Sequence, residues 1–271
     1  MDCPAAGVLI YSGMLIDTHC HLTYPGLFEQ PAAVVGRAAE AGVERIITIG
    51  TDLEDHPRVV GLTREFPAVF GALGIHPHHA EGVSEDAVAA MGREFHENTR
   101  LVAVGECGLD YFNASADRTT QAAIFISQLE LAIELHLPVI LHVRDAHGDA
   151  LAIIRRHRPT GLVVHCFTGS CDEARAWLEL GAWIGFTGII TYKKAGEVRA
   201  ACQMVPDDRL LIETDAPYLS PVPMRHVKIN EPAFVRHTAE FIAALRGQSL
   251  EQLSAVTTSN ACRLFGDQIA G

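Results

Sequence analysis

The stretch IDTHCH, residues 16–21, contains two histidines, His19 and His21, with one residue between them. Two apolar residues, Leu15 and Ile16, lead into Asp17 ahead of this pair. Alternate side chains of a β-strand point to the same face, so a strand here would project His19 and His21 together and turn Cys20 the other way. Two imidazoles placed in this way can chelate one metal ion. Because His-x-His pairs also occur in structural roles, the metal interpretation depends on further ligands at the ends of other strands.

Outward from this stretch, short apolar runs alternate with amphipathic segments of helical period along the whole chain. Strands are predicted at residues 15–18, 45–50, 69–74, 101–106, 138–142, 161–165, 182–186 and 210–213. Helices are predicted near residues 31–41, 55–65, 84–98, 117–136, 147–157, 172–180 and 195–204, and two more near 232–246 and 250–264.

Apolar strands that are each followed by a helix predict parallel strands buried on both faces. The expected fold class is therefore α/β, as a (β/α)8 TIM barrel, regular or slightly irregular, with two C-terminal helices. An open doubly wound sheet is the alternative, and it would favour a glycine-rich phosphate loop after the first strand. His-Cys-His stands there without a glycine cluster. We expect a single barrel domain over residues 14–271 and interpret residues 1–13 as an N-terminal extension, because Met14 could begin the chain.

The composition, 48% hydrophobic and 20% charged, is that of an ordinary globular protein. No apolar stretch approaches the roughly 20 residues that a membrane-spanning helix needs, and the N-terminus lacks the basic region of a secretory signal. Cysteines spread singly, without a C-x-x-C pair, indicate a reduced environment. We therefore expect a cytoplasmic protein without a membrane partner. The sequence leaves the oligomeric state open and is compatible with a monomer.

The net charge of −12 argues against a general nucleic-acid-binding surface. It does not exclude a phosphate substrate, because bound divalent cations and a few arginines can reverse the sign of the charge inside a cleft.

Polar or ionisable side chains follow nearly every predicted strand at its carboxyl end, which is where barrels keep their chemistry. Burying so many of these groups without partners would be costly. The ligand candidates among them are His19, His21, Glu106, His142, His165 and Asp215. They are too many for one tetrahedral zinc site. They suit two divalent ions about 3.5–4 Å apart that share a carboxylate, a pair that orients a substrate oxygen, acidifies a water and neutralises developing charge.

The chain resembles the TatD-like metal-dependent hydrolases, a branch of the amidohydrolase-type barrel enzymes. The resemblance covers residues 14–267, in order and with ordinary spacing. The matching motifs are IDTHCH (16–21), GIHPH (74–78), VGECGLDY (104–111), PVILHVR (138–144), HCFTGS (165–170), ETDAPYL (213–219), NEP (230–232) and NACRLF (260–265).

The resemblance implies that the six ligands divide between two ions and that Glu106 bridges them. The first ion would be held by His19, His21, Glu106 and Asp215, and the second by Glu106, His142 and His165. Asp215 would also orient or deprotonate the attacking water, so Asp215 and Glu106 are the implied catalytic residues. The resemblance further implies phosphodiester hydrolysis supported by magnesium or manganese, as a deoxyribonuclease of 3′-exonuclease type with DNA or another phosphodiester as substrate. The histidine-rich set is also compatible with zinc or nickel.

Residues near the ligands are candidate substrate contacts. Arg144 lies two residues past His142 and could bind a phosphate through two hydrogen bonds, although an ion pair with Asp145 is the alternative. His76 and His78 follow the third strand and could contact substrate, support the ligands or lie on the surface.

Three further candidates come from later loops. Thr168 offers a hydroxyl beside His165, and Tyr218 could stack on a base or simply pack. Arg225 could contact phosphate, but His226 stands where similar chains have glycine, which leaves the course of that loop open. Glu213 shares a strand face with Asp215 one layer deeper, so we expect it to support the ligands.

Cys20, Cys107 and Cys166 each stand beside a ligand candidate. Strand alternation predicts that all three turn away from the site, toward the outer helices, where a free cysteine packs as a small hydrophobe.

Three functions compete on these observations. The first is a metal-dependent phosphodiesterase or deoxyribonuclease, which the resemblance and Arg144 favour. The second is hydrolysis of a small amide, ester or lactone by the same metal site, which the acidic charge and the 7% aromatic content favour. The third is a metal-binding protein without turnover, which would have to keep the whole ligand set for no catalytic purpose.

Overall fold

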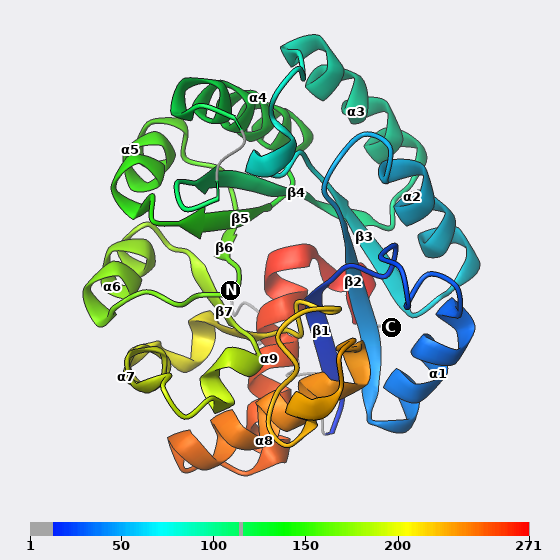
Figure 1. The fold of residues 1–271 in the computed structure, drawn as a ribbon, viewed down its shortest axis with the longest axis vertical. Coiled ribbons are helices and arrows are strands. Elements are labelled where there is room, and N and C mark those ends of the chain that lie inside the picture. The colour runs from blue at the N-terminus through cyan, green and yellow to red at the C-terminus, as the bar shows by residue number, and fades with distance from the viewer. Residues whose placement is uncertain (1–12, 114–115, 271) are drawn as a thin grey trace, which may run out of the picture.

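Eight parallel strands in sequential order form a nearly closed barrel in the computed structural model, which describes residues 13–113 and 116–270 (Figure 1). The strands are β1 (Leu15–Cys20), β2 (Val43–Gly50), β3 (Val69–Leu73), β4 (Leu101–Asp110), β5 (Val139–Arg144), β6 (Leu162–Val164), β7 (Trp183–Phe186) and β8 (Leu210–Ile212). The predicted TIM barrel is confirmed, with register shifts in the β1–β2, β3–β4 and β4–β5 pairs and an incomplete seam between β1 and β8. A single bridge, between Cys20 and Ala216, joins the chain there in place of a ladder.

The helices are α1 (Pro31–Glu40), α2 (His56–Glu65), α3 (Glu85–Glu97), α4 (Arg118–Leu135), α5 (His147–His157), α6 (Cys171–Glu179), α7 (Gly196–Met204), α8 (Val235–Arg246) and α9 (Leu250–Phe265). Helices α1 to α8 surround the barrel as an outer ring, whereas α9 lies behind its centre in the view of Figure 1. The two predicted C-terminal helices are therefore present as α8 and α9. In the described part of the chain, no helix combines the length and apolar character needed to cross a membrane.

Helix α9 seals the end of the barrel at which the strands begin. Its Thr258 hydroxyl donates to the carbonyl oxygen of Met14 (2.8 Å), and its Asn260 amide donates to that of Leu210 (2.8 Å). Phe265 belongs to the apolar cluster that fills the barrel interior together with Ile47. Helix α9 closes this end of the barrel. The cavity described below lies at the opposite end, where the strands finish.

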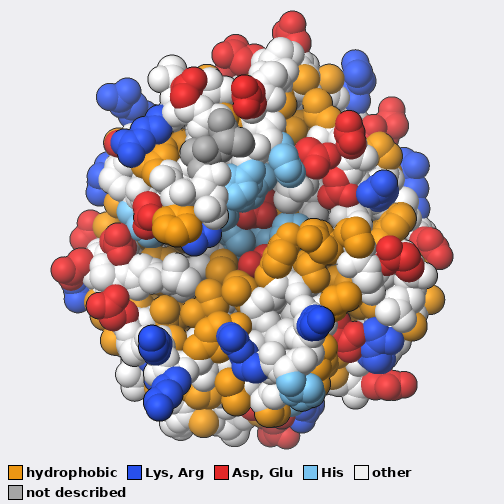
Figure 2. Space-filling view, in the orientation of Figure 1, with side chains coloured by type: hydrophobic (Ala, Val, Ile, Leu, Met, Phe, Trp, Pro, Cys, Tyr) orange, Lys and Arg blue, Asp and Glu red, His pale blue; other side chains and the backbone are white. Residues whose placement is uncertain are grey.

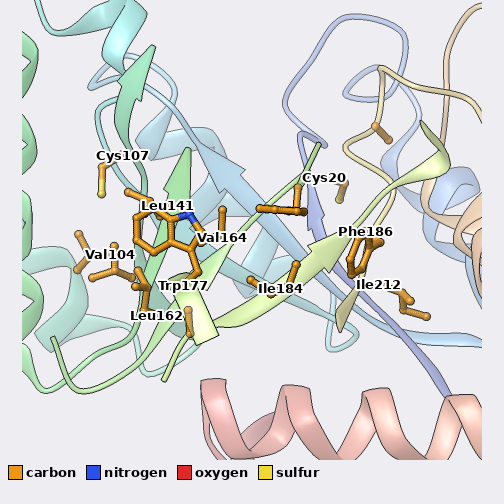
Figure 3. Close-up of a cluster of buried hydrophobic side chains, with 14 of the residues drawn as sticks. Cys20, Val104, Cys107, Leu141, Leu162, Val164, Trp177, Ile184, Phe186 and Ile212 are labelled. Carbon is orange, nitrogen blue, oxygen red and sulfur yellow. The ribbon is translucent and has the colours of Figure 1, made fainter. Parts of the chain in front are cut away.

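A second and larger apolar cluster lies between the sheet and the outer helices (Figure 3). Trp177 of α6 is fully buried within it. Cys20 and Cys107 belong to the same cluster, which confirms that both pack as small hydrophobes.

Cys166 was expected to turn away in the same manner, and this prediction is wrong. The strand ends at Val164, and Cys166 adopts a left-handed backbone with φ 45°. Strand alternation no longer applies there, and Cys166 lines the cavity, with its Sγ 3.7 Å from Oγ1 of Thr187.

Strand β4 is longer than predicted and runs past Glu106 to Asp110. Gly108 makes this possible, because a Cβ atom at that position would collide with the carbonyl oxygen of His142. The glycine, at φ 141°, lets β4 approach β5 closely enough for the ladder to continue.

Apart from Gly13, the predicted N-terminal extension lies outside the described residues. The single-domain boundary at residue 14, the cytoplasmic location and the monomeric state stay predictions.

Candidate metal centre

The predicted ligands converge at the carboxyl end of the barrel, around a cavity of about 860 Å³. Figure 2 shows histidine and acidic side chains in a hollow at the centre of this face. Five of the ligands line the cavity: His21, Glu106, His142, His165 and Asp215. His19 is fully buried behind them. Residues from five different strands or strand ends therefore meet at one place.

Four of these side chains form the first ligand group. The Nε2 atoms of His19 and His21 are 3.3 Å apart. From His19 Nε2, Oε2 of Glu106 lies at 3.5 Å and Oδ1 of Asp215 at 3.8 Å; from His21 Nε2 the same two oxygens lie at 3.8 and 3.4 Å. Atoms that surround an ion tetrahedrally at about 2.1 Å lie about 3.4 Å from one another. The residues therefore fit a divalent ion.

The other oxygen of Glu106 faces the second ligand group. Its Oε1 lies 2.9 Å from Nδ1 of His142 and 2.7 Å from Nε2 of His165. These two ring nitrogens are 3.3 Å apart. Glu106 thus presents one carboxylate oxygen to each group, which is the arrangement that a bridging ligand requires.

His76, predicted as a substrate contact, lies directly beside the Glu106 and His142 side chains of the second ligand group. Its Nε2 is 3.5 Å from Oε1 of Glu106, and its ring centroid is 4.4 Å from that of His142. One potential ligand atom from each of His76, Glu106 and His142 lies within 4.8 Å of the other two. His76 is therefore a further candidate ligand as well as part of the cavity wall.

Asp110 is absent from the predicted site residues. It is fully buried, and its Oδ2 accepts a hydrogen bond from Nε2 of His78 at 2.9 Å and lies 3.3 Å from Nε2 of His142. Its Oδ1 accepts the backbone N–H groups of Phe112 and Asn113. Asp110 therefore fixes the ring of His142 whose other nitrogen faces Glu106. The GLDY motif contains Asp110 and could have indicated it. The predicted strand ended at Glu106, however, so strand alternation could not predict which way the Asp110 side chain points.

We expect Asp110→Asn to weaken metal binding in the second group by about 10- to 100-fold, because His142 loses the charged partner that orients its ring. Isothermal titration with Mn²⁺ measures this directly. Asp149→Asn is the matched control, since Asp149 is an exposed carboxylate that accepts a hydrogen bond from the hydroxyl of Tyr111, the residue after β4. Unchanged binding of both ions by Asp110→Asn would contradict the positioning role.

Two further buried carboxylates hold the ends of neighbouring strands. Glu213, predicted to support the ligands, accepts the N–H of Cys166 at 2.5 Å and lies 3.6 Å from Nδ1 of His165. Asp17 accepts the N–H and the hydroxyl of Thr214, at 2.9 and 2.6 Å. Asp17 thereby ties β1 to the segment that carries Asp215, which the sequence motif alone did not indicate.

The two ligand groups are electrostatically coupled through Glu106. Burial by itself raises the pKa of this carboxyl, but the neighbouring His165 and His76 bring the pKa well below its usual value. Burial by itself lowers the pKa of His165, but Glu106 and then Glu213 bring it well above its usual value. The His165 ring therefore holds a proton strongly.

Metal binding should consequently release protons, because a ligating imidazole must be neutral. His165 is protonated below its raised pKa, so the metal competes with the proton there, and the apparent affinity should rise with pH until the pH exceeds that raised pKa. Competition with a chelator at several pH values, and calorimetry in two buffers of different ionisation enthalpy, measure the two effects. A flat affinity without proton release would contradict this expectation.

Five of the six predicted substrate contacts line the cavity: His76, His78, Arg144, Thr168 and Tyr218. The guanidinium of Arg144 stacks on the exposed ring of Phe112, with 4.0 Å between Cζ and the ring centroid. Among the described residues, the contact of this guanidinium is therefore the Phe112 ring and not the neighbouring Asp145. Arg225 is not brought into the cavity, because its guanidinium stacks on Tyr192 at 3.9 Å.

A TIM barrel with this histidine and carboxylate set at the carboxyl ends of its strands defines a metal-dependent hydrolase of the barrel type. The family model described as TatD related DNase matches residues 16–266, and the chain belongs to this family.

Known proteins agree with this assignment over most of their length. The chain is 37% identical over 254 residues to YabD of Bacillus subtilis strain 168, named an uncharacterized metal-dependent hydrolase; the match covers 93% of this chain and 99% of YabD. It is 39% identical over 258 residues to the 3′-5′ ssDNA/RNA exonuclease TatD of Erwinia tasmaniensis, covering 93% and 99%. The crystal structure of YJJV, a TatD homologue from Escherichia coli K12, superposes with a TM-score of 0.88 at 34% identity, covering 93% of this chain and 97% of YJJV.

Proposed function

We propose that this hydrolase cleaves phosphodiester bonds in single-stranded DNA, as a 3′ exonuclease that uses two divalent metal ions. The observation that carries the proposal is the placement of Glu106, whose two oxygens face separate ligand groups 2.7–3.8 Å away. Two ions bridged by a carboxylate are a recurrent device for displacement at phosphorus. The exonuclease name of the Erwinia relative supports the choice of nucleic acid.

His19, His21, Glu106 and Asp215 would hold one ion, and Glu106, His142 and His165 the other. Bound ions would act as Lewis acids that neutralise charge on a phosphoryl oxygen. Nitrogen-rich ligation suits manganese or zinc at least as well as magnesium.

The protein's own side chains supply the remaining chemistry. Asp215 lines the cavity with its side chain 14% exposed, so its carboxylate can orient an attacking water and take its proton. Arg144 lines the same cavity and carries a fixed positive charge that can contact a phosphate oxygen. The hydroxyl of Thr168 is a hydrogen-bond donor on the same wall.

One observation favours the second candidate function, hydrolysis of a small amide, ester or lactone. Asp52, Glu54 and Asp55 line the cavity on the side of the β2–α2 loop. Their negative charge repels a polyanion that crosses the whole cavity, whereas a small neutral substrate would not be affected.

Assays with added Mn²⁺, Mg²⁺ or Zn²⁺ discriminate between the two functions. We expect 5′-labelled linear single-stranded DNA to shorten from its 3′ end, and a circular single strand, which has no end, to stay intact. Chelation should abolish the activity and a divalent ion should restore it, because the metal ions would neutralise the charge that develops on the phosphate and activate the attacking water. Turnover of simple esters without cleavage of linear DNA or of bis-p-nitrophenyl phosphate would overturn the proposal.

A further inference from the structure

Two tyrosines stand beside the first ligand group at the edge of the cavity. Tyr24 and Tyr218 both line the cavity and are 42% and 47% exposed. Their ring centroids are 5.4 Å apart at an interplanar angle of 69°, and the ring of Tyr218 lies 6.2 Å from that of His21. Such an edge-to-face pair leaves ring surface uncovered by the partner. Figure 2 shows hydrophobic side chains along one edge of the hollow.

The backbone holds both tyrosines in a fixed relation to the ligands. The N–H of Tyr24 donates to the carbonyl oxygen of His21 (3.1 Å), and the N–H of Tyr218 donates to that of Asp215 (2.9 Å). Each tyrosine therefore follows a ligand by one hydrogen-bonded turn. The side-chain amide of Asn230 also donates to the carbonyl oxygen of Tyr218 at 2.6 Å. The pair is thus positioned before any substrate arrives.

The distribution of charge around the cavity favours one orientation of an extended, negatively charged substrate. Beyond Tyr24 lies the acidic β2–α2 loop, whose Asp55 accepts a hydrogen bond from the Thr23 hydroxyl at 2.9 Å. Asp52, Glu54 and Asp55 outnumber Arg58, the cation that lines the same part of the wall. The opposite wall carries Arg144, stacked on Phe112. The phosphates of a nucleic-acid strand can therefore lie along Arg144. The acidic β2–α2 loop would repel any phosphates that extended beyond the tyrosines, so the tyrosines would receive the end of the strand.

We propose that Tyr24 and Tyr218 form a stacking subsite for the terminal nucleobase of single-stranded nucleic acid. The proposal rests on the proposed phosphodiesterase function and identifies the part of the substrate that is held next to the reacting bond. Every nucleobase has a π face, so the subsite selects for a base at the strand end and discriminates weakly among bases.

The test compares two oligonucleotides that differ only in the 3′-terminal unit, a normal nucleotide or a tetrahydrofuran abasic analogue. We expect the enzyme to release the normal unit with a kcat/KM about 5- to 150-fold higher, the range that stacking on an aromatic side chain supplies. Tyr218→Leu and Tyr24→Leu should each reduce this preference, and Tyr218→Phe should retain it because the ring is kept. Phe28→Leu is the matched control, an exposed aromatic residue on the Tyr24 loop that is not part of the cavity lining.

The outcomes separate this subsite from the function on which it rests. Loss of the preference in the leucine variants but not in Tyr218→Phe supports the subsite. Equal hydrolysis of the two oligonucleotides by the unmodified enzyme, or an equal loss on both in the leucine variants, overturns the subsite and leaves phosphodiester hydrolysis standing. Failure of the unmodified enzyme to cleave either oligonucleotide overturns the proposed function, and the subsite with it.

Discussion

Asp215→Asn should nearly abolish turnover and leave the fold intact. The Asp215 carboxylate contacts the first ligand group through Oδ1 and lines the cavity. Burial by itself raises the pKa of Asp215, but the hydrogen bond from His21 and the charge of His19 bring it below its usual value. The carboxylate is therefore ionised and able to accept a proton, whereas a carboxamide of the same size is not. Loss of a general base costs about 10²- to 10⁴-fold in rate.

Asparagine is the informative substitution because of the backbone at this position. Asp215 has a φ of 55°, a left-handed conformation that asparagine adopts as readily as aspartate and that alanine does not. Its N–H still donates to the carbonyl oxygen of His19, so the loop should keep its course. The measurements are kcat on single-stranded DNA, the melting temperature and the metal content.

Asp145→Asn provides the control for this experiment. Asp145 is an exposed aspartate at the end of β5 and has nearly the same left-handed φ, 54°. The same chemical change there should leave kcat unaltered. Near-normal activity of Asp215→Asn would show that another group accepts the proton of the attacking water.

The sequence was sufficient to predict the barrel and the convergence of six candidate ligands, for a physical reason. Parallel strands buried on both faces appear as uninterrupted apolar runs, so a polar residue at the end of such a run marks the strand terminus. His19 and Asp215 lie close to such a terminus, and the barrel brings them together with Glu106, which lies inside the longer strand β4.

The features that the sequence did not reveal depend on backbone geometry beyond strand periodicity. Asp110 was missed because the predicted strand ended at Glu106, whereas Gly108 lets β4 continue alongside β5 to Asp110. Cys166 faces the cavity because its backbone leaves the extended region. Arg225 stacks on Tyr192, a contact between distant loops that no local pattern encodes.

The second large effect is expected for Glu106→Gln. Each oxygen of Glu106 faces one ligand group, and the side chain is buried among histidines. A glutamine keeps the size but loses the charge, and its NH₂ group cannot ligate a cation. We therefore expect the unmodified protein to bind two metal equivalents per chain and the Glu106→Gln variant to bind one or none. The rate on single-stranded DNA should fall by at least about a hundredfold, the effect of losing one preorganised electrostatic contact at the reacting group.

Glu213→Gln separates the bridging role from the general effect of removing a buried negative charge. Glu213 is as deeply buried and also lies near His165, but on the side of Nδ1, away from Glu106. Its substitution should therefore preserve two metal equivalents and change the rate far less. The number of metal ions bound per chain, measured after loading with metal and desalting, distinguishes the two variants. If Glu106→Gln retained both equivalents, the two ligand groups would have to hold their ions independently, and the reading of Glu106 as the residue that joins them would be wrong.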